Sequence, residues 1–281
     1  MGSLRTRMEH DLIVRGRSEA TRRAHLRAVA TLARYHHRAP DQLSEREVQQ
    51  YLRYLIDERR LAWASCRQQV AALRFFYEVT LGRPRHTFSL PLPKAARRLP
   101  QILSREEVAR LLDATQHLKH RLLLMTTYAA GLRVSEVVRV RVTDIDSQRM
   151  LLRVEQGKGN KDRYTLLSPR LLVELRRYYR IYRPTEWLFT DRRRPTPMAT
   201  RSALRIYLAA KQRAGIHKAG GIHTLRHSFA THLLESGIDV VSIQRLLGHA
   251  RVETTAHYLH VTPQRVGVQA SPLDQLALPP V

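Results

Sequence analysis

Cysteine is almost absent from this chain of 281 residues, and long apolar runs are absent too. The one cysteine, Cys66, cannot form a disulfide within the chain. The N-terminus leads into no apolar secretion segment, and no apolar run approaches the roughly 18 residues of a membrane-spanning helix. These absences favour a soluble, cytoplasmic protein, and the length allows two domains with separate cores.

Acidic residues are also few. The chain has 24 Asp and Glu against 49 Lys and Arg, which gives a formal net charge of +25. Nucleic acid is the expected partner, because most of the basic excess is arginine, which binds phosphate through a planar fork of donors. Charge of this size also occurs in ribosome-associated proteins and in arginine-rich genomes, and it does not identify a reaction.

The N-terminal residues 1–90 predict a bundle of three or four amphipathic helices. Ser18 precedes the first apolar stripe, and capping boxes that begin at Ser44 and Ser65 precede the next two. The apolar positions, at helical spacing, are Leu26, Val29 and Ala33, then Val48, Tyr51, Leu52 and Leu55, then Val70, Leu73 and Phe76. The arginines between these positions are either solvated charges or a DNA-facing surface.

A basic stretch with three prolines, within residues 91–102, predicts a linker, because it has too many prolines for a helix and too much charge for a core strand. A second domain is expected over residues 103–262, and a short tail over residues 263–281. This tail mixes prolines with leucines, so we expect it either to dock on a neighbouring protomer or to remain a frayed or self-packed terminus.

The second domain begins with a capping box at Ser104, and a helix over residues 120–130 is expected to stop at Gly131. Arg133 then lies between that helix and the next. Alternating apolar residues predict two paired strands over residues 150–155 and 163–167, which places Lys158 at the tip of a β-hairpin.

Two histidines, an arginine and a tyrosine lie within a few helical turns near the C-terminus. His223 and Arg226 are three residues apart, so they can address one phosphate from one helix face. Gly248 ends a later helix and leaves His249 at its end, and Tyr258 follows. Histidine moves protons near neutral pH, arginine grips phosphate oxygens, and tyrosine is a nucleophile, so the pattern indicates attack on a phosphodiester.

No metal or other cofactor is expected. The histidines of this segment have no cysteine or carboxylate beside them at metal-ligand spacing, and the sequence lacks the Gly-x-x-x-x-Gly-Lys loop of nucleotide-binding proteins.

Five sequence blocks together resemble the tyrosine recombinase, or phage integrase, family, most closely its Xer-like and transposon-associated members. The blocks are Gly-Leu-Arg-Val-Ser-Glu-Val at 131–137, Gly-Lys-Gly-Asn-Lys at 157–161, His-Thr-Leu-Arg-His at 223–227, Leu-Gly-His at 247–249 and Thr-Thr-Ala-His-Tyr at 254–258. The resemblance implies a mainly α fold: an N-terminal SAM-like helical bundle that binds core DNA, and a mostly helical catalytic domain with a small antiparallel β-sheet.

The resemblance also implies a role for each matching residue. Tyr258 would attack the scissile phosphate to give a 3′-phosphotyrosyl intermediate and a free 5′-hydroxyl. Arg133 and Arg226 would clamp the non-bridging oxygens, and Lys158 would act as general acid toward the leaving oxygen. His223 would accept the tyrosine proton.

Further expectations follow from the same resemblance. His249 would hydrogen-bond the phosphate, and Glu136 would support the site. Lys161 and Arg163 are expected to contact the DNA backbone. Recombination would join double-stranded DNA sites in a homotetramer, with a second recombinase or accessory protein left open. A type IB topoisomerase and a catalytically silent DNA-binding protein are the alternatives.

Overall fold

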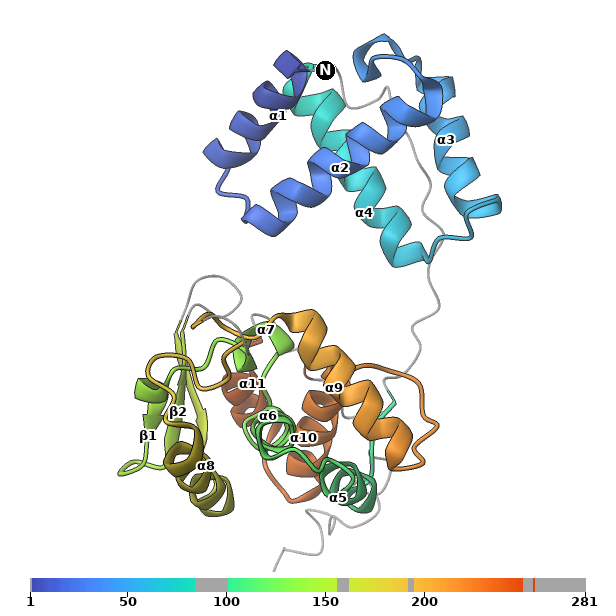
Figure 1. Cartoon of the computed structure of the whole chain (residues 1–281). Helices are drawn as coiled ribbons and strands as arrows, with labels where there is room; N and C mark the ends of the chain where they lie inside the picture. Colours follow the sequence, from blue (N-terminus) through green and yellow to red (C-terminus); the bar gives the residue numbers. More distant parts are fainter. Residues whose placement is uncertain (1, 84–100, 156–161, 192–194, 250–254, 256–281) are drawn as a thin grey trace, which may run out of the picture. The chain divides into compact units, whose positions relative to one another are not determined.

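The computed structural model describes residues 2–83, 101–155, 162–191, 195–249 and 255. The chain divides into two compact units, residues 1–97 and 98–281, and this division falls within the stretch expected to be a linker. Both units are mainly helical, and a small antiparallel sheet lies in the second one, so the predicted fold class is confirmed (Figure 1).

The N-terminal unit is a bundle of four helices, followed by one π-helical segment. Their bounds are α1 Gly2–Val14, α2 Glu19–His36, α3 Glu45–Asp57 and α4 Trp63–Arg74, with the π-helical segment at Phe75–Thr80. Ser18 caps α2 and Ser44 forms the capping box of α3, as predicted. The expected apolar stripes form the buried core of this unit.

Two details of this bundle differ from the sequence-based expectation. The helix α1 was not predicted, although Leu4, Met8 and Leu12 lie four residues apart and the last two are fully buried. The start of α4 at Ser65 is wrong: the helix begins two residues earlier, at Trp63. The Ser-x-x-Gln pattern lies inside the helix, so it does not mark the start of α4.

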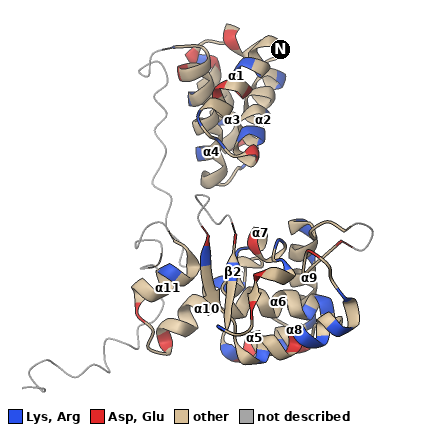
Figure 2. Cartoon of the chain, turned by 90° about the vertical axis from the view of Figure 1, so that its left-hand side faces the viewer, with Lys and Arg blue, Asp and Glu red and all other residues tan. Residues whose placement is uncertain are grey.

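Arginine positions recur along the helices of the N-terminal unit (blue ribbon in Figure 2). The arginines between its apolar stripes are all exposed except Arg22, which is partly buried; the others are Arg23, Arg27, Arg34, Arg46, Arg53, Arg59, Arg60, Arg67 and Arg74. Only two of these pair with acids in the described residues, Arg23 with Glu19 and Arg53 with Asp57, one turn away in each case. Most of this positive charge is therefore free to face a polyanion.

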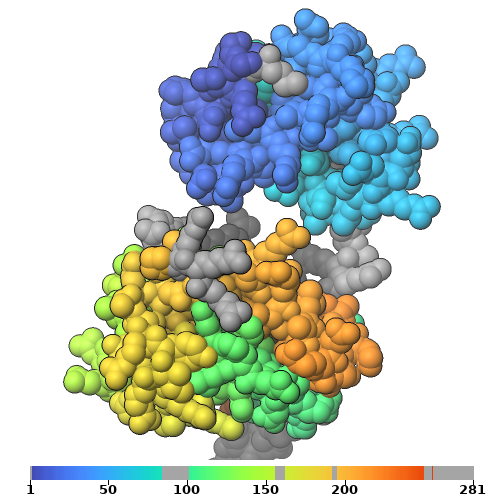
Figure 3. Space-filling view, viewed as in Figure 1, coloured from blue at the N-terminus to red at the C-terminus, as the bar shows by residue number. Residues whose placement is uncertain are grey.

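The C-terminal unit places a three-stranded sheet beside a group of helices. Its elements are α5 Arg105–Asp113, α6 Leu118–Ala129, α7 Val134–Val137, β1 Ile145–Asp146, β2 Leu151–Val154, β3 Arg163–Leu166, α8 Pro169–Tyr182, α9 Thr200–Arg213, α10 His223–Glu235 and α11 Val240–Leu247. The strands are antiparallel in the order β1-β2-β3, with Val154 opposite Arg163. In Figure 3, α8 (yellow), α5 and α6 (green) and α9 (orange) lie on the visible face of this unit.

The central helix of this unit is α6, which contacts α5, α7, α8, α9 and α10. Three successive leucines of α6, from Leu122 to Leu124, are fully buried, so the helix meets apolar neighbours on more than one side. The strand β3 lies against α11. Because α6 ends at Ala129, the turn that follows it starts from a helix packed against five others.

The capping box of α5 provides a test of these helix starts. The Oγ of Ser104 accepts the N–H of Glu107 at 3.2 Å, and the N–H of Ser104 donates to the Glu107 carboxylate at 2.7 Å. We expect Ser104→Ala to destabilise the start of α5 by about 1 kcal/mol, since one terminal N–H loses its acceptor. Hydrogen exchange of the full chain, followed by mass spectrometry, will show faster exchange in α5.

The matched control is Ser44→Ala, which removes the same motif from α3. It is expected to speed exchange in α3 and to leave α5 unchanged. Unchanged exchange of α5 in Ser104→Ala would contradict the capping assignment.

Candidate active site

The turn after α6 presents Arg133. Gly131 adopts the left-handed conformation at φ +61°, and a Cβ atom there would lie 2.4 Å from Cδ1 of Phe229. Glycine is therefore required by both the backbone and the neighbouring ring. The chain then enters α7, and the backbone N–H of Arg133 donates to Oε2 of Glu136 at 2.8 Å. Nη1 of Arg133 donates to Oε1 of the same carboxylate at 2.6 Å.

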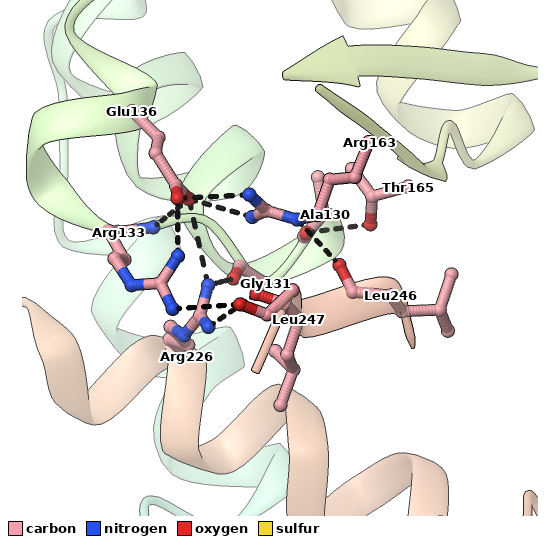
Figure 4. A network of polar contacts seen from close by, with 10 residues as sticks. Ala130, Gly131, Arg133, Glu136, Arg163, Thr165, Arg226, Leu246 and Leu247 are labelled. Carbon is pink, nitrogen blue, oxygen red and sulfur yellow. Dashed lines mark hydrogen bonds and ion pairs between the residues drawn. The ribbon is translucent and has the colours of Figure 1, made fainter. Parts of the chain in front are cut away.

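Arg226 reaches the same place from α10. Its side chain is 4% exposed, and it donates to two backbone carbonyls, those of Gly131 and Leu247, both at 2.7 Å. Its Nη1 lies 3.6 Å from Oε2 of Glu136. Two arginines from distant parts of the sequence thus converge on one carboxylate (Figure 4).

The Glu136 carboxylate is the centre of this network. Its side chain is 6% exposed, and burial by itself raises the pKa of a carboxyl group. The hydrogen bonds and positive charges of Arg163 and Arg133 outweigh that effect and lower the pKa of Glu136 to about 2. Glu136 is therefore ionised at any physiological pH, and it orients the arginines around it.

Arg163 occupies a different position from the one expected. Its Nη1 and Nη2 donate to the two oxygens of Glu136 at 3.0 and 2.7 Å, and its Nε donates to the carbonyl of Leu246 at 2.9 Å. The side chain is only 10% exposed. Arg163 was expected to contact a DNA backbone, whereas in this structure its guanidinium group points inward and binds Glu136.

The burial pattern of β3 accounts for this inward position. In a strand, alternate residues share a face, so Arg163 lies on the same face as Thr165. Thr165 is fully buried, and its hydroxyl donates to the carbonyl of Ala130 at 2.9 Å. An arginine on the core side of a strand needs a buried acid as its partner, and Glu136 provides it.

Two histidines lie beside the arginines. His223 opens α10, and partial desolvation with the charges of Arg226 and Arg133 lowers its pKa. His249 follows α11, and burial with the same arginine charges lowers its pKa to about 3. Its Nδ1 lies 2.8 Å from Oγ1 of Thr255, which is buried. Both histidines are therefore neutral at pH 7 and able to accept a proton.

Three of the predicted site residues, Lys158, Lys161 and Tyr258, lie outside the described residues. Among the described ones, the structure brings together Arg133, Glu136, Arg226, His223 and His249, which come from the α6–α7 turn, α7, α10 and the end of α11.

Two other features are absent from the described part of the chain. No group of three or more His, Cys, Asp or Glu residues there has the arrangement to hold a metal ion. No helix among the described residues is both long enough and apolar enough to cross a membrane.

Comparison with known proteins decides the family. Residues 101–265 match the phage integrase family, and residues 4–87 match the N-terminal SAM-like domain of phage integrases. The chain belongs to the phage integrase family. The resemblance seen in the sequence is confirmed, and this member is a tyrosine-type site-specific DNA recombinase.

Individual relatives agree along most of the chain. A Sinorhizobium fredii protein assigned as an integrase/recombinase, y4qK, is 47% identical over 99% of this chain and 91% of its own length. The tyrosine recombinase XerA of Thermococcus kodakarensis is 38% identical over 76% of this chain and 78% of its own length. A lambda integrase tetramer bound to a Holliday junction has the same fold, with a TM-score of 0.72 and 20% identity over 92% of this chain and 76% of that one.

The phage integrase site depends on Gly131, and this dependence can be measured. We expect Gly131→Ala to destabilise the protein by about 2 kcal/mol or more, because it adds a left-handed alanine and a clash with the ring of Phe229. Gly215→Ala is the matched control, since Gly215 has φ +64° and no atom within 4 Å of its added Cβ. It is expected to cost about 1 kcal/mol.

Urea unfolding of the full chain measures both losses. Equal losses for the two variants would show that the Phe229 ring moves aside without cost, and would remove the argument for Gly131.

Proposed function

We propose that this recombinase cleaves and rejoins double-stranded DNA through a covalent bond between Tyr258 and the 3′-phosphate at each cleaved position. In the forward step, the tyrosine oxygen bonds to phosphorus, the bond from phosphorus to the 5′-oxygen breaks, and a 5′-hydroxyl is released. Attack by a 5′-hydroxyl of the other duplex reverses this step and joins new strands. No nucleotide is consumed, because the phosphotyrosyl ester retains the free energy of the broken bond.

The observation that supports this proposal is the convergence of Arg133 and Arg226 on the ionised Glu136. Both guanidinium groups are held before any substrate arrives, and neither has to reorganise while charge develops on the phosphate. Arg133 is the more accessible of the two, at 19% exposed. The two arginines stabilise the non-bridging oxygens without a metal ion.

The proton transfers are assigned to side chains around this clamp. His223 accepts the proton of the attacking tyrosine, and Lys158 donates a proton to the leaving 5′-oxygen. His249 donates a hydrogen bond to the phosphate. The neutral state of both histidines at pH 7 supports these assignments.

The assembly follows from the reaction. Exchange of strands between two duplexes needs four cleavages, so we assign one protomer to each and propose a homotetramer that passes through a Holliday junction. The lambda integrase tetramer on such a junction has the fold of this chain, which supports the proposal. The substrate also favours a cytoplasmic location. The topoisomerase and silent DNA-binding alternatives are not favoured, because the relatives that match along the chain are recombinases.

Covalent trapping tests the nucleophile. We expect Tyr258→Phe to abolish covalent protein–DNA adducts while DNA affinity stays within about twofold, because one hydroxyl adds little to a contact dominated by phosphates. The measurement incubates the protein with fragmented DNA, denatures the mixture, and sequences the DNA that remains bound.

Adducts at discrete sites that depend on Tyr258 support recombination. Dispersed adducts that depend on Tyr258 would favour topoisomerase activity. DNA binding with no adduct at all would favour a silent DNA-binding protein.

The pH dependence of cleavage tests His223. Because its pKa is lowered, His223 stays neutral as pH falls to 6.5 and becomes protonated only at lower pH. The cleavage rate at subsaturating DNA is therefore expected to hold down to pH 6.5 and to fall below it. His223→Gln should slow cleavage about 100-fold and remove that acid limb.

His217→Gln serves as the control, since His217 is an exposed residue of the loop that precedes α10. An acid limb that persists unchanged in His223→Gln would assign the titration to another group.

A further inference from the structure

The guanidinium group of Arg163 joins three elements of the C-terminal unit. Arg163 opens β3, its two terminal nitrogens bind the Glu136 carboxylate on α7, and its Nε binds the carbonyl of Leu246 near the end of α11. None of the catalytic roles assigned above uses this side chain. It is nevertheless one of the most buried arginines described, at 10% exposed.

The first consequence of these contacts is electrostatic. Three guanidinium groups surround one carboxylate, which leaves a net charge of +2 next to the place where a phosphate binds. Without Arg163, the same carboxylate would be neutralised by Arg133 and Arg226 alone, and the net charge would fall to +1. A phosphodiester has one negative charge and gains more in the transition state. The loss of one positive charge would therefore slow the reaction more than it weakens binding of the phosphate.

The second consequence is mechanical. Gly248 adopts φ +63°, and a Cβ atom there would lie 2.7 Å from Cδ of Arg163. The arginine side chain thus packs directly against the residue that precedes His249. The N–H of His249 donates to the carbonyl of Gln244 at 3.1 Å, so the turn is fixed from both sides.

We propose that Arg163 is a positioning residue for DNA cleavage: it satisfies Glu136 so that Arg133 and Arg226 keep their positive charge for the phosphate, and it fixes the turn that presents His249. This inference rests on the proposed function. It deepens that function by assigning a role to a residue outside the catalytic set proposed above.

The test compares Arg163→Met, Arg163→Lys and wild type in single-turnover cleavage of a DNA site recovered by the trapping experiment. We expect Arg163→Met to cleave about 100-fold more slowly, with DNA affinity within about threefold, because a preorganised charge is lost but no phosphate contact is. Arg163→Lys should recover part of this rate, since it restores the charge without the bidentate geometry.

Arg153→Met is the matched control. Arg153 lies on the neighbouring strand β2, and its Nε binds the buried carboxylate of Asp144 at 3.1 Å. It therefore loses a comparable ion pair, away from the arginine clamp. It is expected to lower stability while cleavage per folded molecule stays within about twofold of wild type.

Two further measurements separate positioning from a merely structural role. A substrate with a neutral methylphosphonate at the cleaved position needs less positive charge, so the defect of Arg163→Met should shrink there to about tenfold or less. The second measurement uses the double variant Glu136→Gln, Arg163→Met, which removes the carboxylate that would otherwise be neutralised by Arg133 and Arg226 alone, and which should cleave faster than Arg163→Met alone.

The outcomes are distinct. An equal defect on both substrates, or a double variant no faster than the single one, would overturn the inference while leaving the proposed function intact. A wild-type protein that forms no Tyr258-dependent adduct would overturn the proposed function, and the inference with it.

Discussion

The ion pairs of one buried carboxylate, Glu136, hold the candidate active site of this recombinase together. An ionised carboxylate at 6% exposure is unfavourable by several kcal/mol unless cations and hydrogen bonds surround it. Here the cations are Arg133, Arg163 and Arg226, which come from the α6–α7 turn, β3 and α10. The requirement to neutralise one charge therefore fixes the mutual positions of elements that are far apart in the sequence.

Backbone carbonyl groups also hold the arginines of this network in position. Arg226 donates to the carbonyls of Gly131 and Leu247, and Nη2 of Arg133 lies 3.4 Å from the carbonyl of Gly248. Carbonyl dipoles orient a guanidinium group without cancelling its charge, whereas a second carboxylate would have neutralised it. Glycines stand at both turns because each has a positive φ, and because a Cβ atom would meet the ring of Phe229 at Gly131 and the side chain of Arg163 at Gly248.

The sequence predicted well those features that depend on neighbours along the chain. Capping boxes at Ser44 and Ser104 marked helix starts correctly, and apolar periodicity identified the core of the N-terminal unit. The sequence did not predict contacts between side chains that lie far apart along the chain. The acid that binds Arg163 lies 27 residues earlier, so an arginine next to a turn was interpreted as a surface charge. The strand β1 has only two residues, which is too short for any period to appear.

The same charge cluster also affects the pKa values of the two histidines. Burial, together with the positive charges of its arginines, lowers the pKa of His223 and His249, so both remain neutral in the protein without DNA. In the proposed reaction, a bound phosphate brings negative charge close to the cluster and offsets this effect, which raises the affinity of a nearby histidine for a proton. Proton acceptance thus becomes more favourable only once the substrate is in place. A single arrangement of charges thereby links phosphate binding to the activation of the nucleophile.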